Sequence, residues 1–384
     1  MTKPHVERIL ITLAIPTYNR LAKLKVLLGS IESQVGGTFF DCQLVICNSE
    51  STDGTFDYIE KMEPFGVVSK IIKSNSTLEP GAPRPANVYN LFRMIPADGG
   101  WVWIIGDDDY LVSPNCLLKI ATAIRDNASP NLALIHPVQG RRSKGSGAVK
   151  RLNLLDGVNA IGFHELLGWL SSLILRADLI EPVLLSEFFD PIDYKSESGN
   201  LNRNKVLADC ASAFRHSAQI LKGCSMFDIL IIDDYFADPQ DADQTPETIA
   251  RWSEESMSIR YMFVVDDIEY LLNLGIIDKG VSATFFRYLT YFFWDRYAHF
   301  VVTDVLNTGS LSDYSLAFME RIERIEKLLV NPFERYMYRS WKGGLFNSVE
   351  DIIKHRKYHL EKCQNLHTAF VVEPSRPFSF EVLQ

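Results

Sequence analysis

The sequence predicts an α/β protein with a mainly parallel sheet flanked by helices, followed by a helical C-terminal region. Two observations lead to this prediction. Over the first hundred residues, short apolar runs alternate with segments whose apolar residues recur every three or four positions, as strands alternate with helices. The runs are apolar almost throughout, which is typical of strands that are covered on both faces. Beyond about residue 200 the pattern becomes mostly helical.

Each element follows from its own pattern of apolar residues and turn signals. We predict that residues 1–235 form one domain and residues 236–384 a helical region. The basic, Gly/Ser-rich segment 139–150 is predicted to be a surface loop. Helices are expected from Leu21 to Val35, over 51–62, around 88–95 and over 113–124. In the last of these, Ser113 would be the cap and Pro114 would stand in the first turn. Strands are predicted at residues 8–16, 42–48, 67–74, 101–105, 132–138 and 169–176.

The composition is that of an ordinary folded protein, since 47% of the 384 residues are hydrophobic and 23% are charged. The formal net charge of −9 argues against non-specific binding of nucleic acid. The six cysteines form no Cys-x-x-Cys pair, which favours reduced, buried thiols over disulfides or a zinc site. No stretch approaches the roughly 20 apolar residues of a membrane span, so we expect a cytoplasmic protein.

Three consecutive aspartates, Asp107 to Asp109, follow the fourth predicted strand. Polar clusters also follow the first strand, at residues 16–20 (PTYNR), and the second, at residues 48–55 (NSESTDGT). Ligands of open α/β sheets bind at the carboxyl ends of the strands, where these clusters should meet. A hard cation such as Mg²⁺ or Mn²⁺ would relieve the repulsion between the carboxylates. Because alternate residues share a face, Asp107 and Asp109 are the expected ligands, with a solvated acidic turn as the alternative.

These clusters resemble the motifs of the family 2 glycosyltransferases, which have a GT-A fold. Pro16-Thr17-Tyr18-Asn19-Arg20 is similar to the motif that ends their first strand, and Asn48 with Ser51–Thr55 to the one after their second. Asp107–Asp109 matches their DxD motif. The chain also resembles an abequosyltransferase-like subgroup of bacterial polysaccharide enzymes. This resemblance rests on the order of Trp, Gly and three aspartates and on the segments SSLILR and FRHSAQIL. The resemblance is specific over residues 8–125, looser to about residue 235 and absent beyond.

The resemblance implies a nucleotide-sugar donor, with UDP favoured, and Mn²⁺ or Mg²⁺ bound by Asp107 and Asp109. The family usually has aspartate at Asn48, which leaves the nucleobase open. Asp53 can instead cap a helix, and Arg84 can be a surface arginine. The residues that the resemblance assigns to the donor are Pro16, Thr17, Tyr18, Arg20, Asn48, Asp53, Arg84, Asn87, Asp107 and Asp108.

Transfer with inversion needs a base that takes the proton of the acceptor hydroxyl. The Glu-Asp pair that usually supplies this base in the family is not visible in the sequence. We favour Asp209, just before a predicted helix, with His216 on that helix as a weaker candidate. The other carboxylates that remain open are Glu165, Asp190 and Asp193.

The resemblance therefore implies a metal-dependent, inverting glycosyltransferase that modifies a saccharide or lipid-linked acceptor in surface polysaccharide synthesis. The alternative is a catalytically degenerate GT-A domain that binds nucleotide-sugars or serves as a scaffold. A Rossmann dehydrogenase is excluded because Gly-x-Gly-x-x-Gly is missing after the first strand. A haloacid-dehalogenase phosphatase is disfavoured because Ser51 stands where its aspartate nucleophile would be. The helical C-terminal third leaves three roles open: covering the acceptor, homodimer formation and peripheral membrane contact. Its aromatic segment 285–300 is more typical of a packed core than of a membrane anchor.

Overall fold

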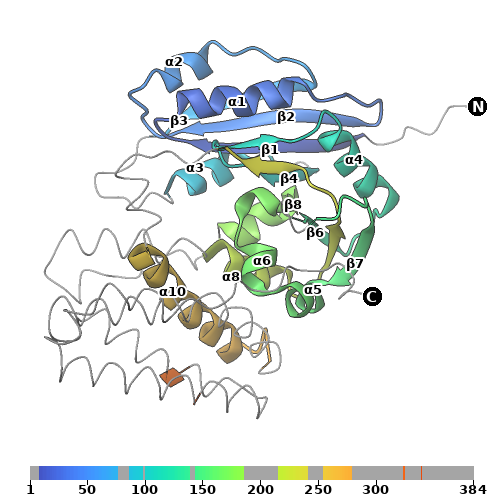
Figure 1. Cartoon of the computed structure of the whole chain (residues 1–384), viewed down its shortest axis with the longest axis vertical. Helices are drawn as coiled ribbons and strands as arrows, with labels where there is room; N and C mark the ends of the chain where they lie inside the picture. Colours follow the sequence, from blue (N-terminus) through green and yellow to red (C-terminus); the bar gives the residue numbers. More distant parts are fainter. Residues whose placement is uncertain are drawn as a thin grey trace, which may run out of the picture.

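The computed structural model describes residues 8–76, 86–97, 100–138, 143–185, 215–240 and 254–278, with residues 323, 324 and 339. They form a mixed, mainly parallel sheet with helices on both faces, which confirms the predicted α/β fold (Figure 1). The strands of the main sheet are β1 (Ile9–Thr17), β2 (Phe40–Asn48), β3 (Val68–Asn75), β4 (Trp101–Ile104), β6 (Leu132–Pro137), β7 (Val149–Asn153), β8 (Ile174–Arg176) and β9 (Asp228–Ile232). Their order in the sheet is β3-β2-β1-β4-β8-β6-β9-β7.

The first four strands form the parallel half of the sheet. β1 pairs with β2 along its whole length, from Ile9 opposite Phe40 to Thr17 opposite Asn48. β3 continues the ladder on the far side of β2, with Asn75 opposite Asn48. Since these strands run in one direction, their polar last residues lie side by side at one edge of the sheet.

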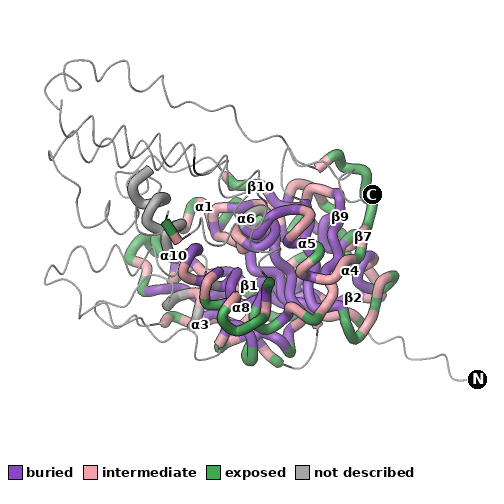
Figure 2. The backbone as a smooth tube through the Cα atoms, turned by 90° about the horizontal axis from the view of Figure 1, so that it is seen from below, coloured by how far each residue is buried: buried purple, intermediate pink, exposed green. Residues whose placement is uncertain are grey.

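Alternate residues of the strands face two separate hydrophobic cores, which is why the strands are apolar almost throughout. Ile11, Leu13 and Ile15 of β1 pack into one core, whereas Ala14 faces the other. In Figure 2 the buried backbone concentrates around β1 and β9. The helices that contribute to the first core are α1 (Leu21–Glu32), α2 (Thr55–Glu60) and α4 (Cys116–Asp126). Those that contribute to the second are α3 (Ala86–Met94), α5 (Leu154–Ile161), α6 (Phe163–Leu167), α8 (Arg215–Cys224) and α10 (Glu254–Asn273).

The second half of the sheet contains the antiparallel strands. β8 lies between β4 and β6 and runs against both, and β7 runs against β9 at the outer edge. A small second sheet pairs β5 (Asp109–Leu111) with β10 (Ala237–Pro239), so the third aspartate of the triplet begins a strand. Short turns surround β8: η2 (Leu170–Ser172), η3 (Ala177–Leu179) and η4 (Ile180–Leu184).

Several predicted boundaries were wrong. The first helix ends at Glu32, and Val35, which we had placed on its buried face, is 46% exposed. The helix predicted to start at Ser113 and Pro114 starts at Cys116, because Ser113 turns back and accepts a hydrogen bond from the Asn115 N–H. The strand predicted from residue 169 opens instead with the 3₁₀ turn η2, and only its last residues form β8.

Four strands were missed: β5, β7, β9 and β10. The end of the predicted surface loop 139–150 already belongs to β7, where Val149 and Lys150 pair with β9. β9 itself lies beyond residue 200, in the part predicted to be mostly helical, because a five-residue apolar strand has no periodicity that separates it from a buried helix.

The described part of the chain supports the remaining expectations on composition. Cys42, Cys47, Cys116 and Cys224 are free and buried, as predicted. Among the described residues, no helix combines the length and the apolar character needed to cross a bilayer. β10 and Gln240 contact the first domain just past the predicted boundary at residue 235. That boundary stays a prediction, and the aromatic segment 285–300 lies outside the described residues.

Candidate active site

The chain leaves β4 through Ile105 and Gly106 and then enters the aspartate triplet. A Cβ atom on Gly106 would lie 2.9 Å from Asp108 Oδ1 and 3.0 Å from Asp109 Oδ2. Any side chain at this position would therefore push the carboxylates apart. The glycine before the triplet thus lets the three aspartates fold tightly over the end of the strand.

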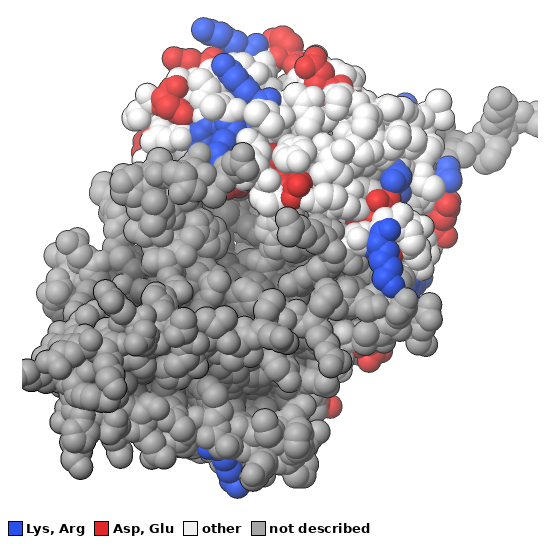
Figure 3. All heavy atoms as spheres, in the orientation of Figure 1, with Lys and Arg blue, Asp and Glu red and all other residues white. Residues whose placement is uncertain are grey.

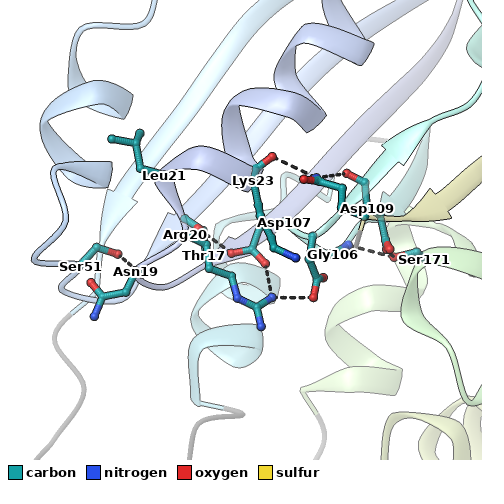
Figure 4. A network of polar contacts seen from close by, with 12 residues as sticks. Thr17, Asn19, Arg20, Leu21, Lys23, Ser51, Gly106, Asp107, Asp109 and Ser171 are labelled. Carbon is teal, nitrogen blue, oxygen red and sulfur yellow. Dashed lines mark hydrogen bonds and ion pairs between the residues drawn. The ribbon is translucent and has the colours of Figure 1, made fainter. Parts of the chain in front are cut away.

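Asp107 is held by the motif that ends β1 (Figure 4). Its Oδ2 accepts a hydrogen bond of 2.8 Å from Thr17 Oγ1, and its Oδ1 accepts one of 2.9 Å from Arg20 Nη1. The same guanidinium nitrogen lies 2.7 Å from Asp108 Oδ2. One cation therefore serves two carboxylates, and it already relieves part of the repulsion within the triplet.

Asp109 points to different partners. Ser171 in η2 donates its hydroxyl to Asp109 Oδ2, and the Gly106 N–H donates to the same hydroxyl oxygen over 2.9 Å. The Asp109 carbonyl oxygen accepts a 2.9 Å hydrogen bond from Gln240 Nε2, which also reaches the carbonyl oxygen of Lys23. η2 and the segment after β10, both distant in sequence, thus hold the third aspartate.

The negative charges of the buried Asp107 and Asp109 are only partly compensated by their hydrogen bonds and by Arg20. Asp107 is 5% exposed and Asp109 is 3% exposed. Burial raises the pKa of Asp107 to about 6 although Arg20 opposes the shift. Burial likewise raises the pKa of Asp109 to about 7, against the hydrogen bond from Ser171. Both carboxylates would therefore gain from an additional cation.

The cluster after β2 joins the same edge through a chain of hydrogen bonds. The Asn19 N–H donates to Ser51 Oγ over 2.8 Å, and Ser51 donates to Asn48 Oδ1 over 2.5 Å. Asn48 Nδ2 donates to Asn75 Oδ1 at the end of β3 over 2.6 Å. With the bonds from Thr17 and Arg20 to Asp107, these contacts confirm that the three polar clusters converge.

Two residues at this edge, Asn19 and Glu50, have left-handed backbones, with φ of 49° and 52°. Asparagine adopts this conformation with some ease, but for glutamate it is strained. Strained backbone of this kind collects at binding and catalytic sites, where the surrounding contacts hold it in place. At Glu50 the holding contact is the hydrogen bond from its N–H to Asn75 Oδ1.

Asp53 binds the backbone at the start of two helices, although the N-cap residue of α1 is Arg20 and that of α2 is Gly54. Its Oδ2 accepts a 2.9 Å hydrogen bond from the Leu21 N–H, and its Oδ1 accepts one of 3.1 Å from the Thr55 N–H. Burial alone would raise the pKa of Asp53, but the bonds from Leu21 and Thr55 outweigh it and lower that pKa. Asp53 thus ties the starts of α1 and α2 together. Its contact with a ligand stays a prediction.

The remaining candidates are only partly described. Tyr18 is 46% exposed at the end of β1, next to the half-buried Pro16. Arg84, Asp190, Asp193 and Asp209 lie outside the described residues, as do the side chains of Asn87 in α3 and Glu165 in α6. His216 in α8 is buried, and its Nε2 lies 2.9 Å from the carbonyl oxygen of Leu167. Burial lowers the pKa of His216 to about 4, so the ring is neutral at pH 7.

Sequence reasoning missed three residues that contact the site: Asn75, Ser171 and Gln240. Asn75 directly follows the strand predicted over residues 67–74 and ends the observed β3 opposite Asn48, so its place could have been read from the parallel alignment. Ser171 was assigned to a strand interior, and Gln240 is more than a hundred residues away from Asp109 in the chain. Nothing in the local sequence around Ser171 or Gln240 indicates that either residue contacts Asp109.

Asp107 and Asp109 could hold a divalent cation only together with ligands from elsewhere. Among the described residues, no group of three His, Cys, Asp or Glu side chains is arranged to hold a metal ion. Mg²⁺ is nevertheless often bound through one or two carboxylates plus substrate phosphates. Asp107 and Asp109 offer that smaller set, and their raised pKa values favour a cation. On the face shown in Figure 3, acidic and basic side chains of the described part are interspersed.

Comparison with known proteins agrees with this geometry. The family model described as glycosyl transferase family 2 matches residues 12–150. Among curated protein sequences, the comparison found none that matches the chain. The crystal structure of S. aureus TarS 1–349 in complex with UDP-GlcNAc is similar with a TM-score of 0.53 at 18% identity, covering 90% of this chain and 91% of that one. TarS 1–349 without that ligand gives a TM-score of 0.52 at 14% identity, with the same coverage. Residues 12–150 are thus similar to the glycosyl transferase family 2 model, and the chain shares the fold of TarS 1–349.

Proposed function

We propose that the chain is a metal-dependent, inverting glycosyltransferase that transfers a sugar from a nucleotide-sugar to a hydroxyl group of its acceptor. The observation that supports this most is the pair of buried, under-compensated carboxylates Asp107 and Asp109. They stand at the sheet edge that the motifs around Thr17, Arg20 and Asn48 also reach. A cation would supply the positive charge that this edge lacks, and the diphosphate would supply the cation with further oxygen ligands.

The residues of the chain would divide the work as follows. Asp107 and Asp109 would hold Mn²⁺ or Mg²⁺, which when bound supplies a Lewis acid for the leaving diphosphate. Thr17 keeps Asp107 in place, and Ser171 does the same for Asp109. Arg20 is the cationic side chain nearest to the triplet among the described contacts, so we assign it to the phosphate groups. Asp108, whose side chain is 42% exposed, would face the donor without binding the metal.

UDP is the favoured nucleotide of the donor. TarS, whose fold this chain shares, was crystallised in complex with UDP-GlcNAc. The sequence motifs point to the same class of donor. The acceptor that we favour is a saccharide or lipid-linked saccharide in surface polysaccharide synthesis, at the cytoplasmic side of the membrane. This rests on the sequence resemblance to abequosyltransferase-like enzymes, and the C-terminal region is where we would look for dimer or membrane contacts.

For the acceptor base we retain Asp209 ahead of His216. The neutral ring of His216 is buried, and its Nε2 is engaged by the Leu167 carbonyl, so it would need to move to reach an acceptor. Asp209→Asn should keep UDP binding and reduce transfer by about 10²–10⁴-fold, the usual effect of losing a general base. If transfer is near normal, the base is to be sought at Glu165, Asp190, Asp193 or His216.

Calorimetry of UDP binding in Mn²⁺ and in EDTA tests the donor site. In the wild type, UDP should bind much more tightly with Mn²⁺, because Asp107 and Asp109 would hold the cation and its charge would attract the diphosphate. Asp109→Ala should make the two titrations alike, whereas Asp108→Ala should leave their difference largely intact.

The outcomes separate the proposal from its rival. UDP binding that is equally tight in EDTA would show that the triplet is not a metal site. Metal-dependent UDP binding without any hydrolysis or transfer would instead favour the degenerate GT-A domain that binds nucleotide-sugars or acts as a scaffold. Release of free sugar from a UDP-sugar in the presence of Mn²⁺ would exclude that rival.

A further inference from the structure

Gln240, the residue that follows β10, binds the main chain of the aspartate triplet and not its carboxylates. The Gln240 N–H donates to the carbonyl oxygen of Asp108 over 2.7 Å. Its side-chain Nε2 donates to the carbonyl oxygen of Asp109 over 2.9 Å and to that of Lys23 over 3.1 Å. One residue thus holds two consecutive peptide groups of the triplet and joins them to α1.

The side-chain amide of Gln240 has one favourable orientation. Both of its partners are backbone carbonyl oxygens, which only accept hydrogen bonds, so the amide must present its amino group to them. An amide turned the other way would place its oxygen against two other oxygens. The orientation therefore follows from the partners, although the oxygen and nitrogen of an amide look alike.

These contacts hold the turn that directs the two carboxylates. Within the turn, the Asp109 N–H donates to the Gly106 carbonyl oxygen over 3.1 Å. Gln240 binds the same turn from a position 131 residues further along the chain. Through Lys23 it also ties the turn to α1, the helix that starts directly after Arg20. Since Arg20 holds Asp107, Gln240 links the segment that holds Asp107 to the segment that carries Asp109.

We propose that Gln240 is a positioning residue for the metal site, which keeps the carboxylates of Asp107 and Asp109 at the separation that a divalent cation needs. Gln240 acts on the backbone that carries these ligands and not on the cation itself. Loss of a residue that orients metal ligands typically lowers metal affinity about 10–100-fold. The inference rests on the proposed function, because only a metal site depends on that separation.

Gln34 offers a matched control away from the site. It is 5% exposed, and its Nε2 also donates to two backbone carbonyl oxygens, those of Ser30 over 3.1 Å and Ser113 over 2.8 Å. Gln34 follows the far end of α1, roughly 16 Å from Lys23 at a rise of about 1.5 Å per helical residue. The two glutamines make the same kind of contact, but of the two only Gln240 binds the triplet.

The test compares Gln240→Met with Gln34→Met, because methionine has a similar length but cannot donate a hydrogen bond. Calorimetry measures UDP affinity in Mn²⁺ and in EDTA, and urea unfolding measures stability. Gln240→Met should weaken UDP binding about tenfold or more at limiting Mn²⁺ and leave it unchanged in EDTA. A large excess of Mn²⁺ should restore the lost affinity, which it would not do for a general loss of structure. Gln34→Met should lower the urea midpoint and keep both UDP affinities at their wild-type values.

The outcomes separate this inference from the proposed function. If Gln240→Met binds UDP at limiting Mn²⁺ as tightly as the wild type, the inference is wrong and the proposed function stands. The same holds if its affinity falls equally in EDTA, or if Gln34→Met shows the same loss. Should Gln240→Met fail to fold, Gln240→Asn, whose amide is one methylene too short to bridge both carbonyls, takes its place with the same expectations. A wild type that binds UDP equally well in Mn²⁺ and in EDTA would overturn the proposed function and this inference together.

Discussion

Two turns at the same edge of the sheet treat a buried aspartate in opposite ways. After β4, Asp107 and Asp109 are 5% and 3% exposed, and burial raises their pKa values to about 6 and about 7. After β9, Asp233 is 1% exposed, yet its pKa is lowered.

The hydrogen bonds that each carboxylate accepts contribute to this difference. Burial alone would raise the pKa of Asp233, but Ser146 Oγ, the Lys144 N–H and Ser143 Oγ donate to it over 2.6, 2.9 and 3.0 Å and outweigh that effect. Through these hydrogen bonds, the negative charge of Asp233 holds the loop before β7 in place. Asp107 and Asp109, after β4, each accept fewer hydrogen bonds than Asp233, and they lie in a run of three negatively charged residues. A buried aspartate is therefore structural when the fold satisfies it, and a candidate for ligand binding when the fold does not.

The largest expected effect separates the two turns by activity. Asp107→Asn should reduce transfer or hydrolysis of a UDP-sugar by at least about 100-fold, because the metal loses a charged ligand. Asp233→Asn should keep that activity and lose about 1–3 kcal/mol of unfolding free energy, because donors that point at a charge now meet a neutral amide. Initial rates and urea unfolding of both variants measure this. Should Asp233→Asn be the inactive one, the contrast drawn here is wrong.

The second effect concerns the cation that the fold already supplies. Arg20→Gln removes the charge shared by Asp107 and Asp108 and should lower the unfolding free energy by about 1.5–3 kcal/mol, the usual contribution of hydrogen bonds to charged groups. Mn²⁺ should restore part of this loss, since it can take the place of the guanidinium. Urea titrations with and without Mn²⁺ provide the measurement.

Lys119→Gln is the matched control for Arg20→Gln. Lys119 also pairs with an aspartate, Asp234, but its side chain is 52% exposed. Such pairs contribute about 0–1 kcal/mol, so this variant should be nearly as stable as the wild type and insensitive to Mn²⁺. An equal response of both variants to Mn²⁺ would mean that the metal acts elsewhere.

The smallest effect is on the pH dependence of stability. The folded-state pKa values of Asp107 and Asp109 lie above the ordinary value of 3.8. Between about pH 4 and 7 the folded state therefore binds more protons than the unfolded state, and stability that is present at low pH is lost as the pH rises. Asp109→Asn should flatten this fall in metal-free protein. Melting temperatures from pH 4 to 8 in EDTA report it, and an unchanged slope would show that Asp109 is not the titrating group.

The sequence by itself determined the parallel half of the fold and the meeting of its polar motifs. β1, β2 and β4 are short apolar runs that end in polar motifs, and parallel strands bring those motifs to one edge. Thr17, Arg20, Asn48 and the aspartate triplet could therefore be predicted to meet. Asp53 could be expected at the start of a helix because that signal is local.

Only the tertiary structure decided what surrounds that edge. Ser171 reaches Asp109 because β8 runs antiparallel between β4 and β6, a choice that depends on strand partners far apart in the chain. Gln240 reaches the same residue because β10 pairs with β5. The orientation of the Asn75 amide depends on a backbone N–H of the neighbouring turn. Local pattern predicted the strands of the parallel half, but hydrogen-bond partners and burial, and with them the pKa values, depend on which strands become neighbours.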